Sequence, residues 1–261
     1  MTVRRGNVSI GIAGALGADA ARIIAPAVEQ AGFHALWVND TPGADSLEVL
    51  AAAAAITTSL VLATGVIPLD RRPADDVAAA VAQRGLPSER LVLGVGAGGA
   101  RVGALALVEE GVRTLQDRTG ARVFVGALGP RMRRLAVDHA DGVLLSWLSP
   151  AAAAEQARES GDAEVALYAR TALDPAAVAR RDEEAHRYAG YPAYAANFAR
   201  LALDPLDTLL PLPGDAGIGP GVAAYAAVVD DLVLRAITPA DTVEEYLRFI
   251  EQARVALAVT G

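Results

Sequence analysis

Short apolar runs alternate along this chain with longer segments of helical pattern. The runs from Leu60 to Leu69 and from Leu91 to Gly99 contain no charged residue, and an alanine-rich segment with Asp75 and Asp76 in its first turn lies between them. A strand that is apolar at every position is typical of a parallel sheet covered on both faces. This stretch therefore predicts a strand, a helix and a second, parallel strand.

The same alternation continues over the whole chain and predicts eight strands, each followed by a helix. The expected strands are Val8–Ala13, Ala35–Val38, Leu60–Leu69, Leu91–Gly99, Arg122–Ala127, Gly142–Leu148, Glu164–Arg170 and Asp231–Ile237. Eight such units favour a closed (β/α)8 barrel, a TIM barrel, over an open doubly wound sheet. The length of 261 residues fits one barrel domain over residues 1–261.

Capping residues delimit several of the helices. Asp45 and Ser46 are expected to cap one helix, because their side-chain oxygens accept hydrogen bonds from free backbone N–H groups. Pro130 and Pro150 suit first helical positions, where no backbone donor is lost. These signals predict helices over 17–30, 130–139 and 150–159, one over 102–118, and a last helix after a cap at 238–241.

One interval between strands is much longer than the others. Residues 176–229 contain an aromatic cluster and then a proline- and glycine-rich stretch, Asp204–Gly221. Long insertions of this kind often form lids. The helical spacing of Tyr191, Tyr194 and Phe198 instead predicts packing of this helix onto the barrel, and both interpretations stay open. The aromatic residues are Tyr188, Tyr191, Tyr194 and Phe198.

Composition excludes several classes of function. All 23 basic residues are Arg, and the net charge of −8 argues against a nucleic-acid or anionic-membrane surface. The chain has no Cys, and its three His have no metal-ligand spacing, so we expect neither thiol chemistry nor a metal site. The uncharged stretch 49–69 is divided at 57–59 and predicts a buried helix and strand, not a membrane span. We expect a cytoplasmic protein that acts on a small molecule, with a homodimer as the default assembly.

In a (β/α)8 barrel the active site lies at the carboxyl ends of the strands. Glycines there let a flat ligand approach the backbone, and Gly129-Pro130 also begins a helix whose free N–H groups suit an anion. No His, Cys, Lys or paired carboxylates occur at these ends, which favours a site that holds a reactive cofactor. The candidate site residues are Asp40, Gly65, Val66, Gly96, Ala97, Gly98, Gly126, Gly129, Pro130, Ser146 and Arg235.

Five segments resemble the luciferase-like monooxygenase superfamily. They are GFHALWVND (32–40), LVLATGVIPL with Arg71-Arg72-Pro73 (60–73), ERLVLGVGAG (89–98), VGALGPRMRRLAVDHADGVLL (125–145) and DDLVLRAITPADTVEEYLRFIEQAR (230–254). The last segment is similar above all to actinobacterial members that use the deazaflavin coenzyme F420.

This resemblance implies a luciferase-like barrel that binds F420, or alternatively FMN, over the strand ends. It implies a non-prolyl cis peptide at Gly65-Val66, and contacts from Gly96–Gly98 and Gly129-Pro130 to the cofactor's side chain and phosphate. The implied reaction is hydride transfer between F420 and an organic substrate, with FMN-dependent monooxygenation as the alternative.

Two residues have open roles. Asp40 would contact the ring or substrate as the catalytic residue, or it caps its own loop. Arg235 would contact substrate or cofactor, or it pairs with Asp231 or Asp241. Many family members have His after the strand-two Asp, where this chain has Thr41, and the chain is shorter than usual. A barrel that has lost catalysis and acts as a binding or scaffold protein is therefore a further alternative.

Overall fold

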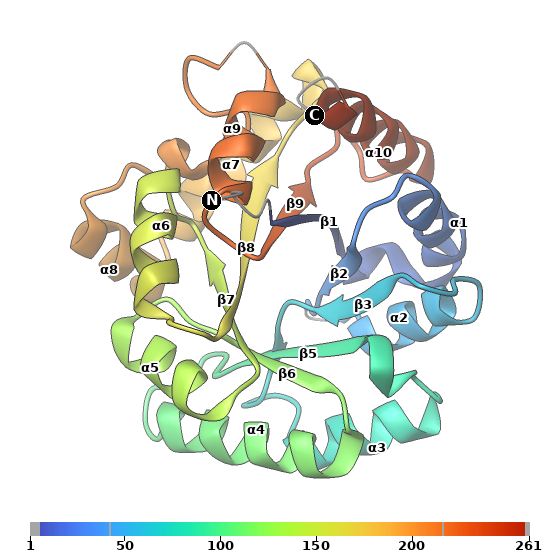
Figure 1. Ribbon diagram of the computed structural model, residues 1–261, viewed down its shortest axis with the longest axis vertical. Coiled ribbons are helices and arrows are strands. Elements are labelled where there is room, and N and C mark those ends of the chain that lie inside the picture. The colour runs from blue at the N-terminus through green and yellow to red at the C-terminus, as the bar shows by residue number, and fades with distance from the viewer. Residues whose placement is uncertain (1–5, 42, 216, 259–261) are drawn as a thin grey trace.

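Parallel strands close into a barrel that is surrounded by helices (Figure 1). The computed structural model describes residues 6–41, 43–215 and 217–258. The strands are β1 (Asn7–Ala13), β2 (Ala35–Asn39), β3 (Val61–Thr64), β4 (Ile67–Pro68), β5 (Leu91–Gly96), β6 (Arg122–Gly126), β7 (Gly142–Ser146), β8 (Glu164–Thr171) and β9 (Asp231–Ala236). Segments β3 and β4 flank Gly65 and Val66 and form one barrel strand, so the barrel has eight. Pairing of β3 with both β2 and β5 completes the ring, and the predicted (β/α)8 barrel is confirmed.

Eight helices cover the outside of the barrel in the described part of the chain. They are α1 (Gly17–Gln30), α2 (Ser46–Ala54), α3 (Ala74–Gln83), α4 (Ala104–Thr119), α5 (Pro130–His139), α6 (Pro150–Glu159), α9 (Ile218–Ala226) and α10 (Val243–Ala258). The capping signals act as expected: the side chain of Asp45 accepts hydrogen bonds from the N–H groups of Leu47 and Glu48, and α5 and α6 begin at Pro130 and Pro150.

The barrel interior is packed with its own cluster of side chains, separate from the larger core between strands and helices. Trp37 lies at its centre and forms edge-on ring contacts with Phe124 and Tyr168, at centroid distances of 6.1 and 5.9 Å. The cluster consists of Ala35, Trp37, Ala63, Val92, Phe124, Leu144, Ala166, Tyr168 and Val233. The barrel is therefore a solid core, and a ligand can enter only above it.

Polar groups close the amino end of the barrel. Asp231 is buried and accepts hydrogen bonds from Ser9 Oγ (2.6 Å) and Trp37 Nε1 (2.9 Å). Arg122, the first residue of β6, and Glu164, the first residue of β8, form an ion pair of 2.6 Å at the same end of the barrel. Burial raises the pKa of Asp231, and the two hydrogen bonds favour its charged form.

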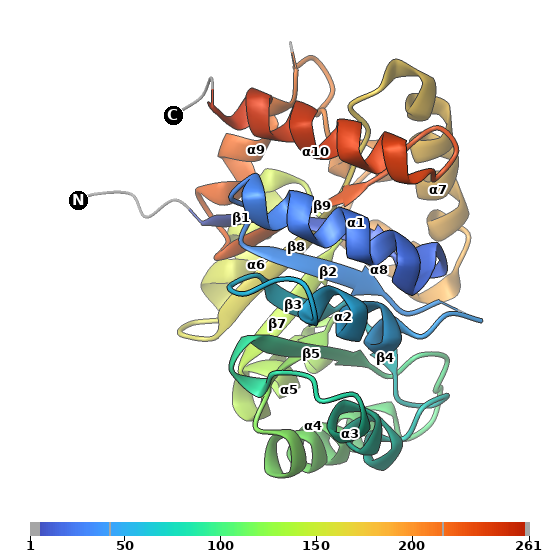
Figure 2. The ribbon, with the colours of Figure 1, turned by 90° about the vertical axis from the view of Figure 1, so that its right-hand side faces the viewer.

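The described part of the long interval between β8 and β9 contains three α-helices and two short 3-10 helices. Two of them, α7 (Val178–Ala189) and α8 (Pro192–Leu201), lie at the end toward which the strand arrows point in Figure 2. The third, α9, packs against α6 and α10 and occupies the place of an outer barrel helix. The end of the proline- and glycine-rich stretch 204–221 belongs to this helix: Pro220 lies in the first turn of α9, where its missing N–H breaks no helical hydrogen bond.

The aromatic cluster of the insertion packs onto the end of β7. Tyr188, Tyr194 and Phe198 surround Trp147 together with Ala185 and Leu209, whereas Tyr191 is 47% exposed. The packing predicted for Tyr191, Tyr194 and Phe198 is confirmed for Tyr194 and Phe198, whereas it is wrong for Tyr191. A lid role of the insertion stays a prediction. None of the described helices is long and apolar enough to cross a membrane, and no cluster of metal-ligating side chains occurs among the described residues.

Candidate functional site

The carboxyl-end mouth of the barrel is built by the residues that follow the inner cluster at strand spacing. Because side chains alternate between the two faces of a strand, the residue two positions after an inward-facing one also faces inward. Asn39 follows Trp37, Gly126 follows Phe124, and Arg235 follows Val233 in this way. The mouth residues so defined are Asn39, Gly65, Gly96, Gly126, Ser146, Arg170 and Arg235.

The side chain of Val66 lies across this mouth and forms an apolar surface, which we call the shelf. A Cβ atom at Gly126 would lie 2.8 Å from Val66 Cγ1, and one at Gly96 would lie 3.0 Å from Val66 Cγ2. The two glycines therefore make room for the Val66 side chain, which is itself half-buried. The peptide between Gly65 and Val66 is cis, as the resemblance implied. A ligand at the mouth would lie on Val66 rather than directly on the glycines.

Two polar atoms beside this shelf lack partners among the described residues. Asn39 donates from Nδ2 to the carbonyl oxygen of Gly65, which leaves its buried Oδ1 without a hydrogen bond. The hydroxyl of Tyr168 is also buried without a partner, and it lies 2.5 Å from the position of a Cβ built on Gly65. Burial raises the pKa of Tyr168, so the hydroxyl keeps its proton. Buried groups of this kind usually have partners, so these two atoms are unusual among the described residues.

Asp40 lies on the other side of its strand. Its carboxylate accepts a hydrogen bond of 2.9 Å from Ser46 Oγ at the start of α2. Burial raises the pKa of Asp40, and the Ser46 hydrogen bond opposes that shift. The loop-capping reading describes this contact, whereas a catalytic role of Asp40 stays a prediction. Because side chains alternate between the two faces of β2, the inward-facing Trp37 predicts that Asn39, and not Asp40, faces the barrel interior. This signal is present in the sequence.

The glycine loop after β5 already holds a carboxylate. The N–H of Gly99 donates to Asp70 Oδ2 at 2.8 Å, and a Cβ at Gly98 would overlap the Asp70 carboxylate. Gly98 has φ +59°, a left-handed conformation that favours glycine. A cofactor phosphate at Gly98 would have to displace Asp70. The predicted cofactor contacts of Gly96 and Ala97 stay predictions.

The start of α5 is open. No atom lies within 4 Å of a Cβ built on Gly129, and no side chain caps the helix. Free N–H groups at a helix start favour an anion. The structure therefore leaves room for a phosphate at Gly129 and Pro130, and the predicted contact there stays a prediction.

Arg170 is held rigidly at the mouth. It donates to Ser146 Oγ (2.9 Å) and to Glu184 Oε1 of α7 (3.2 Å), and its guanidinium lies 3.9 Å from the ring centre of Trp147 and 4.9 Å from that of Tyr188. Burial opposes ionisation of Glu184, but Arg170 and Arg235 outweigh it and hold the pKa of this carboxyl below its usual value. Ser146 therefore positions Arg170, a contact that the sequence did not predict.

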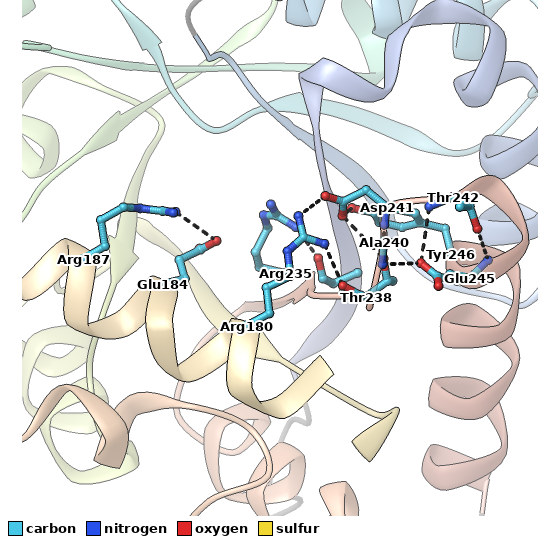
Figure 3. Close-up of polar contacts among 11 residues, drawn as sticks. Arg180, Glu184, Arg187, Arg235, Thr238, Ala240, Asp241, Thr242, Glu245 and Tyr246 are labelled. Carbon is cyan, nitrogen blue, oxygen red and sulfur yellow. Dashed lines mark hydrogen bonds and ion pairs between the residues drawn. The ribbon is translucent and has the colours of Figure 1, made fainter. Parts of the chain in front are cut away.

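Arg235 lies between α7 and the chain that follows β9 (Figure 3). It donates to the carbonyl of Ala236 and lies beside the hydroxyl of Tyr246. Burial works against its charge, but Tyr246 and Glu184 outweigh this and raise the pKa of Arg235. It forms no ion pair with Asp231, which binds Ser9 and Trp37, or with Asp241, which binds Arg180 and Tyr246. The expected pairing of Arg235 with either acid is therefore wrong.

Comparisons with known proteins agree with this architecture. The sequence profile of the luciferase-like monooxygenase family matches residues 7–106. Monooxygenase RslO1 from Streptomyces bottropensis superposes with a TM-score of 0.70 at 17% identity, covering 97% of this chain and 99% of that chain. No sequence among the curated proteins matches this chain significantly.

Two further solved structures indicate the range of chemistry on this fold. Coenzyme F420-dependent tetrahydromethanopterin reductase from Methanopyrus kandleri has a TM-score of 0.70 at 18% identity, covering 98% of this chain and 99% of that chain. The oxygenating constituent of 3,6-diketocamphane monooxygenase from Pseudomonas putida, solved with FMN, has a TM-score of 0.64 at 14% identity, covering 97% and 98%. The family profile matches residues 7–106 and the solved structures share the barrel fold, so the resemblance to luciferase-like monooxygenases expected from the sequence is confirmed.

Proposed function

We propose that this protein is an F420-dependent oxidoreductase that transfers a hydride between the deazaflavin and a small organic substrate at the carboxyl-end mouth of the barrel. The observation that carries this proposal is the pair of unpartnered polar atoms, Asn39 Oδ1 and Tyr168 Oη, beside the apolar shelf of Val66. A flat ring with a polar edge matches this combination, because its face packs on Val66 while its edge supplies the missing hydrogen bonds.

The bound deazaflavin would supply the hydride, which is the part of the chemistry that the side chains at the mouth lack. The chain's own residues bind and orient. Val66 would support one face of the ring, and Asn39 is held by its hydrogen bond to Gly65 so that Oδ1 can accept from a ring N–H. The protonated hydroxyl of Tyr168 can donate. The insertion would shield its side of the mouth from water through the packing of Tyr188 on Trp147.

The resemblance of the last segment to F420-using members favours F420 over FMN. The test is equilibrium binding of F420 and of FMN to the purified protein, followed by fluorescence quenching. We expect F420 to bind at micromolar concentration and FMN to bind more weakly. Failure of both to bind at tens of micromolar would overturn the proposal and leave the scaffold reading. Tight binding of FMN alone would replace hydride transfer from F420 by a flavin reaction.

A matched pair of variants locates the site. Asn39→Ala removes one proposed hydrogen bond and should weaken F420 binding roughly tenfold, which corresponds to about 1.4 kcal/mol. Asn7→Ala alters an exposed Asn at the opposite end of the barrel and should leave binding unchanged. Equal affinities of the two variants would exclude the mouth as the binding site.

A further inference from the structure

We infer that Arg235 is an oxyanion-binding residue, and that the substrate of the mouth carries a carboxylate or phosphate group. That the bound anion belongs to a substrate rests on the proposed function, whereas the anion site itself is argued from the charges of the described residues. It names the substrate class that the sequence left open.

Two arginines occupy neighbouring positions on the inner face of the barrel. Arg170 and Arg235 are register partners on the parallel strands β8 and β9, so their backbones lie side by side. Like charges directly opposite each other in a sheet are unfavourable unless an opposite charge joins them. On the other side of Arg235, its register partner on β1 is Gly11, which contributes no side chain.

The described carboxylates at this end are fewer than the guanidinium groups. Glu184 is bound to Arg170 and, at 3.6 Å, to Arg187. Asp241 is bound to Arg180 and accepts from the hydroxyl of Tyr246 at 3.0 Å. No described carboxylate lies within ion-pair distance of Arg235, whose two acceptors, the Ala236 carbonyl and the Tyr246 hydroxyl, are both neutral. Four guanidinium groups, those of Arg170, Arg180, Arg187 and Arg235, therefore face two carboxylates, and Arg235 is the one that has no carboxylate partner. Figure 3 shows Arg235 between the residues of α7 and those that follow β9.

The two arginines have different tasks. Arg170 already uses its guanidinium for Ser146 and Glu184, and it also packs against the rings of Trp147 and Tyr188. Arg235 is only partly buried and keeps N–H donors free. A planar guanidinium with free donors matches the two oxygens of a carboxylate or phosphate. Arg235 is therefore the binding residue and Arg170 a positioning residue that adds to the local positive charge.

The position of Arg235 assigns the anion to the substrate rather than to the cofactor. The open helix start at Gly129, which suits the cofactor phosphate, follows β6. Arg235 is on β9, and strands β7 and β8 lie between them in the ring. An anion at Arg235 and a phosphate at Gly129 can therefore be bound at the same time.

The experiment uses the protein without cofactor and two probes, malonate and inorganic phosphate, at constant ionic strength. Binding is measured by calorimetric titration for the wild type, Arg235→Gln and Arg187→Gln. Arg187→Gln removes the same charge from α7 at the same end of the barrel, but Arg187 is exposed and contacts only Glu184 and the ring of Tyr188. We expect malonate to bind the wild type, at least tenfold loss for Arg235→Gln, and less than twofold change for Arg187→Gln.

Three outcomes decide the matter. Equal binding to the wild type and Arg235→Gln, or no binding of either probe to the wild type, overturns the inference. F420 titrated into Arg235→Gln should bind as it does to the wild type; weaker F420 binding together with competition by malonate would assign the anion to the cofactor and overturn the substrate class. If F420 binds neither protein while malonate binds through Arg235, the oxidoreductase proposal fails and the oxyanion site stands.

A second variant, Arg235→Lys, keeps the charge but loses the planar guanidinium. It should bind malonate with intermediate affinity, and it replaces Arg235→Gln in the test if that variant does not fold.

Discussion

The two ends of the barrel treat their polar groups in opposite ways. At the amino end, Arg90 donates four hydrogen bonds of 2.9 to 3.0 Å to three backbone carbonyls and the Thr57 hydroxyl. One carboxylate oxygen of Glu29 accepts four hydrogen bonds, of 2.7 to 3.0 Å, from residues 58–60. At the carboxyl end, Asn39 Oδ1, Tyr168 Oη and Trp147 Nε1 are buried without partners among the described residues.

This difference separates stability from function within one fold. Satisfied polar groups at the amino end fix the chain between helices and strands, where no ligand is needed. Buried polar groups without partners at the carboxyl end lower stability, and under the proposed function a ligand would supply the missing hydrogen bonds. The same division between a stable and a functional face is general for (β/α)8 barrels. Changes at the amino end should therefore lower stability without affecting ligands, and changes at the carboxyl end should do the reverse.

The largest effect is expected at Arg90. Arg90→Ala leaves several carbonyl groups near α2 and β3 without a donor and should lower the free energy of unfolding by about 3 kcal/mol. Arg113→Ala is the control, since Arg113 forms only an exposed ion pair with Glu109 and should cost about 0.5 kcal/mol or less. Urea unfolding measures both. F420 binding by folded Arg90→Ala should equal that of the wild type; a parallel loss of binding would contradict the division.

A smaller effect with a defined pH dependence is expected at Glu29. The N–H of Ser59 is the main cause that lowers the pKa of Glu29 to about 2; burial opposes the shift, and the N–H groups of Thr58 and Leu60 add to it. Because the folded pKa lies below the usual value near 4.5, the carboxylate stabilises the fold above pH 4.5, and this contribution is lost as the pH falls toward 2.

Glu29→Gln should therefore cost about 1 kcal/mol at pH 7, a value reduced for the solvent near this group. The difference from the wild type should shrink steadily in urea unfolding between pH 5 and about pH 3. Glu109→Gln, which alters the exposed pair with Arg113, serves as the control. A Glu29→Gln deficit that is the same at all these pH values would show that the lost contacts are not those of a carboxylate.

The smallest effect, and the one of opposite sign, is expected at Tyr168. Tyr168→Phe removes a buried hydroxyl without a partner and should leave stability unchanged or raise it by up to about 1 kcal/mol. Tyr225→Phe is the matched control, because the Tyr225 hydroxyl is also buried but donates to the carbonyl of Leu148 at 2.6 Å, so its loss should cost about 1 kcal/mol. Thermal unfolding compares the two. Equal destabilisation by both would mean that Tyr168 has a partner, and only Tyr168→Phe should weaken F420 binding.

Local signals in the sequence determined the elements of this protein. Apolar runs, the Asp45 cap and the prolines at 130 and 150 gave strands and helices within a few residues of those observed, because each signal acts within one turn or one strand. The eightfold repeat gave the barrel. The helix α9 was not expected, since Gly219, Pro220 and Gly221 disfavour a helix and only packing on α6 and α10 stabilises it.

Only the tertiary structure decided how the ends of the strands are used. The candidate glycines lie at the mouth as their positions at strand ends required, but Val66 and Asp70 fill the space beside Gly126 and Gly98. Likewise Arg170 and Arg235 are the same residue type at the ends of neighbouring strands. Only their distant neighbours decide that Arg170 forms an ion pair with Glu184 on α7, whereas Arg235 has the neutral hydroxyl of Tyr246 on α10 beside it. Partners far apart in the chain meet only after the ring closes, so no local pattern encodes which polar group remains unpaired.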